Sequence, residues 1–108
     1  MKNYEQTTAT EEISMIDNAN KSSLELLFRG YKDGNEYKPW PATEVKKAID
    51  GFLGLLERKR VLHTESDEVA EADKDQEKIT SLTQITAGLD GNDIVSPEIL
   101  EEIKSSLQ

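Results

Sequence analysis

The sequence predicts an all-α fold, a small bundle of three to four helices packed around a central amphipathic helix. Apolar residues recur at helical spacing in several segments, and residues that favour turns separate these segments. A chain of 108 residues without cysteine is long enough for one domain that folds without disulfides. We therefore expect a single helical domain at residues 11–108, preceded by a disordered polar tail at residues 1–10.

The central helix is predicted at residues 43–57. At 100° per residue its apolar side chains fall within an arc of about 160°: Val45, Ala48, Ile49, Phe52, Leu53, Leu55 and Leu56. An arc of this width predicts contacts with two or three neighbouring helices. We expect the helix to end near Glu57 or Arg58, because a longer helix would bring Lys59 and Arg60 into the apolar arc.

Two glycines, Gly51 and Gly54, lie inside this predicted helix. Each costs about 1 kcal/mol relative to alanine in a helix interior, so their presence needs an explanation. Close approach of another backbone, from this chain or from a second one, would provide it.

Three further helices are expected. The first runs from Glu11 to a stop at Gly30, and the polar run at residues 17–23 is either a weak middle, which we favour, or a break. Another lies between Lys78 and Gly88. The last begins with Ser96 as N-cap and Pro97 at the first helical position.

The loop at residues 32–42 is rich in turn residues and places Trp40 between two prolines. Proline disfavours helix in the residue before it, so Trp40 is held on a stiff extended segment. We favour the interpretation that the indole packs this loop onto the helices, since a large aromatic side chain contributes much of a small core. The alternative is an aromatic anchor for a partner.

The net charge of −9 is concentrated in the C-terminal part, because residues 65–108 carry twelve acidic and three basic side chains. The acidic run at residues 64–77 is expected to be a solvated linker or the frayed start of a helix. Such a balance argues against direct nucleic-acid binding and is compatible with a basic surface on another protein. The basic cluster at residues 58–60 is expected to pair with acidic groups nearby.

Catalytic, cofactor and metal sites are not expected. His63 is the only histidine and is assigned to the surface beside the basic cluster. The two D-G-N turns, at Asp33 and Asp90, resemble calcium loops in composition but lack ligands or the glycine at required positions. Phosphate-binding glycine loops and nucleophile elbows are absent from the sequence.

We therefore expect a soluble, cytoplasmic, acidic protein-binding module with a regulatory, accessory or inhibitory role. No apolar run is long enough to span a membrane. The expected contact surface, for a partner or for self-association, comprises Trp40, Phe52 and Leu55. One alternative is a winged-helix DNA-binding regulator with residues 42–62 as its recognition helix, although P-W-P replaces the helix that should precede it. An enzyme is the remaining, least supported alternative.

Overall fold

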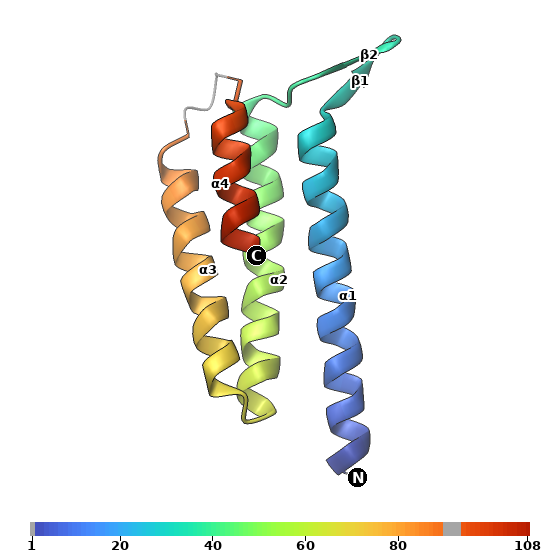
Figure 1. The fold of residues 1–108 in the computed structure, drawn as a ribbon, viewed down its shortest axis with the longest axis vertical. Helices are drawn as coiled ribbons and strands as arrows, with labels where there is room; N and C mark the ends of the chain where they lie inside the picture. Colours follow the sequence, from blue (N-terminus) through green and yellow to red (C-terminus); the bar gives the residue numbers. More distant parts are fainter. Residues whose placement is uncertain (1, 90–93) are drawn as a thin grey trace.

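The computed structural model describes residues 2–89 and 94–108, with side chains from residue 9 onward. In chain order the elements are α1 (Lys2–Arg29), β1 (Tyr31–Asp33), β2 (Glu36–Lys38), α2 (Ala42–Glu65), α3 (Val69–Ala87) and α4 (Pro97–Leu107). The helices run alternately up and down, with α1 and α3 on either side of α2 and the short α4 lying across α2 between them (Figure 1). The predicted small helical bundle is confirmed.

The first helix is continuous through residues 17–23, as favoured above, and it ends as expected before Gly30. Gly30 has φ = +87°, and a Cβ at this position would clash with the backbone carbonyl of Lys38, so only glycine fits. The helix begins at Lys2, where the sequence predicts a disordered tail. Extending an existing helix adds one hydrogen bond per residue and needs no new nucleus.

The loop after α1 contains a β-hairpin that the sequence analysis did not predict. Its two short strands pair antiparallel, with Tyr31 opposite Lys38 and Asp33 opposite Glu36. Gly34 occupies the first position of the two-residue turn with φ = +66°. This placement is typical of hairpin turns that match the twist of the strands.

The central helix continues to Glu65, so the predicted end near residue 57 is wrong. The prediction assumed that Lys59 could not enter the buried side of the helix. In the structure the Lys59 side chain is only 12% exposed, and it lies 2.8 Å from Asp17 of α1. Charge pairing between helices therefore allows the helix to continue.

The acidic run adopts the helical alternative and not the solvated linker. After a tight turn in which Asp67 has φ = +62°, α3 begins at Val69 and buries Ala72 and Asp75 against the bundle. The helix ends at Ala87, close to the predicted position. The start of α4 is confirmed as well, since the Ser96 hydroxyl accepts a hydrogen bond from the backbone N–H of Ile99 at 3.4 Å.

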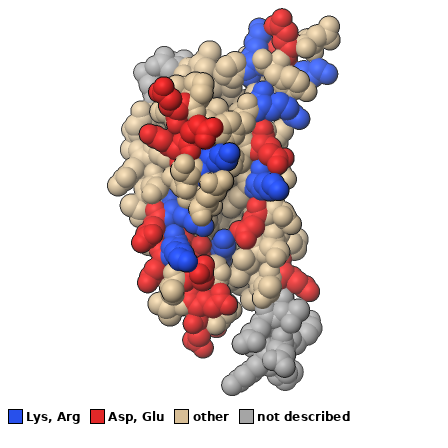
Figure 2. Space-filling view, in the orientation of Figure 1, with Lys and Arg blue, Asp and Glu red and all other residues tan. Residues whose placement is uncertain are grey.

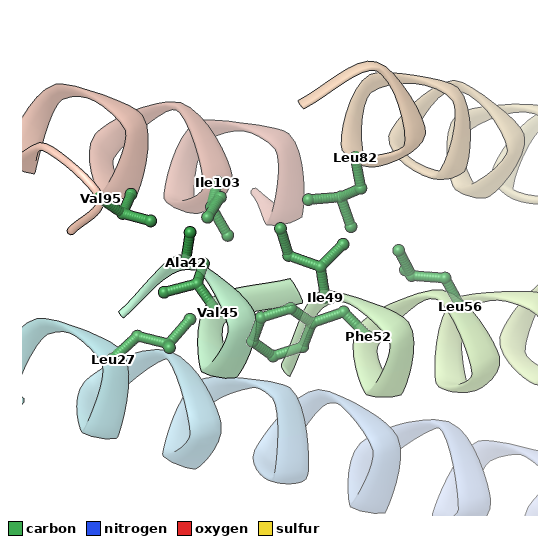
Figure 3. Close-up of a cluster of buried hydrophobic side chains, with 9 residues drawn as sticks. All are labelled: Leu27, Ala42, Val45, Ile49, Phe52, Leu56, Leu82, Val95 and Ile103. Atoms are coloured by element: carbon green, nitrogen blue, oxygen red, sulfur yellow. The ribbon is translucent and has the colours of Figure 1, made fainter. Parts of the chain in front are cut away.

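The core lies where all four described helices meet (Figure 3). The central helix contributes most of it, and single side chains from the other helices close it. Its buried members are Leu27, Ala42, Val45, Ile49, Phe52, Leu56, Leu82, Val95 and Ile103.

Candidate functional site

The fourth helix covers only part of the bundle. It has 11 residues where α2 has 24, which corresponds to helix lengths of about 16 Å and 36 Å. Beside α4 and beyond its C-terminal end, α1, α2 and α3 border a cavity of about 760 Å³. We call this cavity the α4 groove; its lining includes Asn20 and Leu24 of α1, Leu56 and Lys59 of α2, Lys78 of α3, and Lys104 and Leu107 of α4.

Basic side chains gather around the groove although the protein is acidic. Four lysines line it, Lys21, Lys59, Lys78 and Lys104, together with three carboxylates. Lys104 also lies over the ring of Phe28, with its Nζ 5.8 Å from the ring centroid. Figure 2 shows basic and acidic side chains interspersed over this face. The apolar lining and the lysines together make an amphipathic surface.

The floor of the groove is joined to a buried polar cluster below it. Lys59 lies 2.8 Å from Asp17 and 4.0 Å from Asp75. Asp75 is 2% exposed and accepts a hydrogen bond at 2.6 Å from Nδ1 of His63, because an ionised carboxylate can only accept. These contacts connect α1, α2 and α3 through charged groups that are largely removed from water.

One buried polar group at the groove lacks a partner. Asn20 is 7% exposed, and its Oδ1 atom accepts no hydrogen bond from the described residues. Burying an acceptor without a donor costs about 1–3 kcal/mol.

The prediction that His63 is a surface residue is wrong, since it is 5% exposed. A histidine oriented by aspartate resembles the base of a catalytic triad. Its other ring nitrogen, however, lies 3.6 Å from a carboxylate oxygen of Glu68. The His63–Asp75 contact joins α2 to α3.

The three predicted contact residues do not form one surface. Phe52 is 1% exposed and lies in the core, which corrects its assignment to a contact surface. Trp40 is partly buried against the core and donates its indole N–H to the Leu26 carbonyl oxygen at 2.9 Å, as expected for a packing residue. Leu55 is about 20 Å further along the helix axis from the start of α2, far from Trp40.

The predicted local pairing of the basic cluster is only part of what the structure shows. Arg60 pairs with Glu57 one turn earlier, and a hydrogen bond from this guanidinium lowers the pKa of Glu57. Arg58 instead reaches α1, where its Nε donates to Glu12 at 2.6 Å; that hydrogen bond raises the pKa of Arg58. The cluster therefore ties α2 to α1 as well as to its own helix.

Sequence analysis missed Asp75 and the groove. Asp75 lies on the same helical stripe as Ala72, Ile79 and Leu82, at spacings of three, four and three residues. A carboxylate inside an apolar stripe is a signal of a buried polar contact. The groove has no such signal, because it arises from the length of α4 relative to its neighbours.

Among the described side chains, those of residues 9–89 and 94–108, no three of His, Cys, Asp or Glu are arranged to hold a metal ion. Of the two turns compared with calcium loops, Asp33 lies in the β-hairpin, and residues 90–93 lie outside the described residues. No helix in the described ranges combines the length and apolar character needed to cross a bilayer. Comparison with models of protein families, with curated proteins and with solved structures found no match.

Proposed function

We propose that this protein is a protein-binding module whose α4 groove receives one amphipathic helix of a partner protein. The observation that carries this proposal is the incomplete bundle. Four helices surround the core; alongside α4 and at its C-terminal end, the groove runs between α4 and α1 and reaches Leu56 and Lys59 of α2 and Lys78 of α3. The helix α4 ends there, whereas α1, α2 and α3 continue (Figure 1).

The dimensions of the groove favour a helix as its occupant. Its lining along α1, from Asp17 to Phe28, spans about 17 Å, which corresponds to about 11 helical residues. A free helix of that length is only marginally stable in water. We therefore expect the partner segment to order as it binds, with apolar side chains at positions i, i+3, i+4 and i+7 contacting Leu24, Leu56 and Leu107.

The charge of the groove favours an acidic partner helix. The bundle already holds one such helix, because α4 carries Glu98, Glu101 and Glu102 beside an apolar face. A partner with carboxylates on its flanks would meet Lys21 and Lys78, for which the structure records no ion pair with a described residue. Complementary charge of this kind determines orientation and increases the association rate.

Two earlier interpretations have less support. An acidic surface that binds a basic partner would use the C-terminal charge but not the groove. A winged-helix regulator requires a wing after its recognition helix, whereas in the described residues α2 is followed by the long helix α3.

The test reverses charge in the groove. We expect Lys21→Glu/Lys78→Glu to weaken capture of the partner by at least about tenfold, since two charge pairs are lost and repulsion replaces them. The measurement is quantitative affinity purification from the source cell, with the partner then titrated as a purified protein. Crosslinking with mass spectrometry should join the partner segment to the groove walls.

The matched control is Lys32→Glu/Lys46→Glu, which changes the net charge equally at sites outside the groove lining. Equal capture by both double variants, or crosslinks that map only to the hairpin or to the far side of α2, would contradict the proposal.

A further inference from the structure

A second surface lies on the side of α1 and α2 away from the α4 groove. A shallow, almost wholly apolar cavity of about 340 Å³ opens there. Met15, which is 70% exposed, borders it together with Leu55 and Ala19, and the Glu12–Arg58 ion pair closes one side. We call this surface the outer face. The methionine and the depression together leave apolar surface in contact with water, and burying such surface against a partner is favourable.

The two helix-interior glycines lie beside the same depression. Gly51 is four residues before Leu55, and Gly54 is four residues before Arg58, so all four share the outward side of α2. A Cβ built at either glycine meets no described atom within 4 Å. Of the two explanations left open for these glycines, close approach of a backbone of this chain does not occur within the described residues, and the surface is open to a helix of a second molecule.

The charged residues on this side of α2 are arranged so that the surface is complementary to a second copy of itself. Asp50 lies four residues before Gly54, and Arg58 lies four residues after it. When two copies of α2 pack antiparallel about a two-fold axis at Gly54, Asp50 of each copy faces Arg58 of the other. A two-fold interface requires such self-complementarity, because the same patch is used twice. Binding of an unrelated partner would not require that Asp50 and Arg58, which are opposite in charge, lie at the same distance in sequence before and after Gly54.

We propose that the chain forms a two-fold symmetric dimer through the outer face. Helix α2 packs antiparallel against α2 of a second copy, with backbones close at Gly51 and Gly54, and Met15 and Leu55 of both copies form the apolar centre. Arg58 is held toward this face by Glu12. The α4 groove stays accessible in the dimer, because Leu56 and Lys59 lie on the opposite side of α2 from Gly54.

The decisive variant is Gly54→Gln, because it separates folding from association. In the monomer the added side chain meets open space and raises helix propensity, so the thermal midpoint of a dilute sample should stay the same or rise. In the dimer it holds the two helices apart. We expect the dissociation constant, measured by sedimentation equilibrium from 5 to 200 µM, to rise at least about tenfold.

Ser105→Gln, an exposed position on α4, is the matched control and should leave the dissociation constant unchanged. Asp50→Arg alone should weaken the dimer, because it places two like charges across the two-fold axis. The proposal is overturned by a wild-type chain that is monomeric at 200 µM, or by a dimer that Gly54→Gln or Asp50→Arg leaves intact while circular dichroism shows a folded protein.

Discussion

Replacing Asp75 by alanine is expected to lower the free energy of unfolding by about 3–5 kcal/mol, the typical cost of removing one member of a buried charge pair. His63 would lose the carboxylate that accepts its Nδ1–H, and Lys59 would lose one of its two acidic neighbours. Since domains of this size are stable by about 5–15 kcal/mol, the variant should be close to unfolding in water. Urea unfolding followed by circular dichroism at pH 7 measures the loss.

The control is Asp73→Ala on the same helix, an exposed aspartate whose removal should change stability by no more than about 0.5 kcal/mol. A further variant distinguishes charge burial from packing. Exchanging Lys59, His63 and Asp75 together for Met, Leu and Leu should recover most of the stability, because apolar groups of similar volume need no partner. If Asp75→Ala unfolds at the same urea concentration as Asp73→Ala, the buried cluster is not a structural element of this fold.

The second large effect is expected for Phe52→Ala, which should cost about 3–5 kcal/mol because a buried aromatic is removed from a closely packed core. The ring is surrounded by side chains of several helices (Figure 3). Its exposed fraction of 1% leaves almost no area for a partner. The same urea titration gives the value.

Leu55→Ala is the comparison for this prediction. Leu55 is partly exposed on the outer face, so its truncation should cost about 1 kcal/mol and act mainly on self-association. The opposite ranking, with Leu55→Ala the more destabilising change, would mean that the helix is rotated relative to this structure.

The central helix could be predicted from the sequence because its buried apolar residues recur with the period of an α-helix. That pattern located α2, and the residue types favoured at helix ends located the cap at Ser96 and the stop at Gly30; each of these depends on neighbours within a few residues. The end of α2 was not predictable in the same way. Lys59 enters the buried side only because Asp17 and Asp75, more than fifteen residues away in either direction, supply charges there.

The predicted contact surface was assigned incorrectly for the same reason, since it too depends on residues distant in the sequence. A stripe of apolar residues does not reveal which members face another helix of the chain and which face outward, so Phe52 and Leu55 were assigned together although one is buried and the other borders the outer face. The fold class, the acidic balance and the order of the helices follow from residue spacing, turn chemistry and composition, which are local properties. The α4 groove, the burial of His63 and Asp75 and the open side of Gly54 each depend on which elements lie next to each other in space, so they become visible in the folded chain alone.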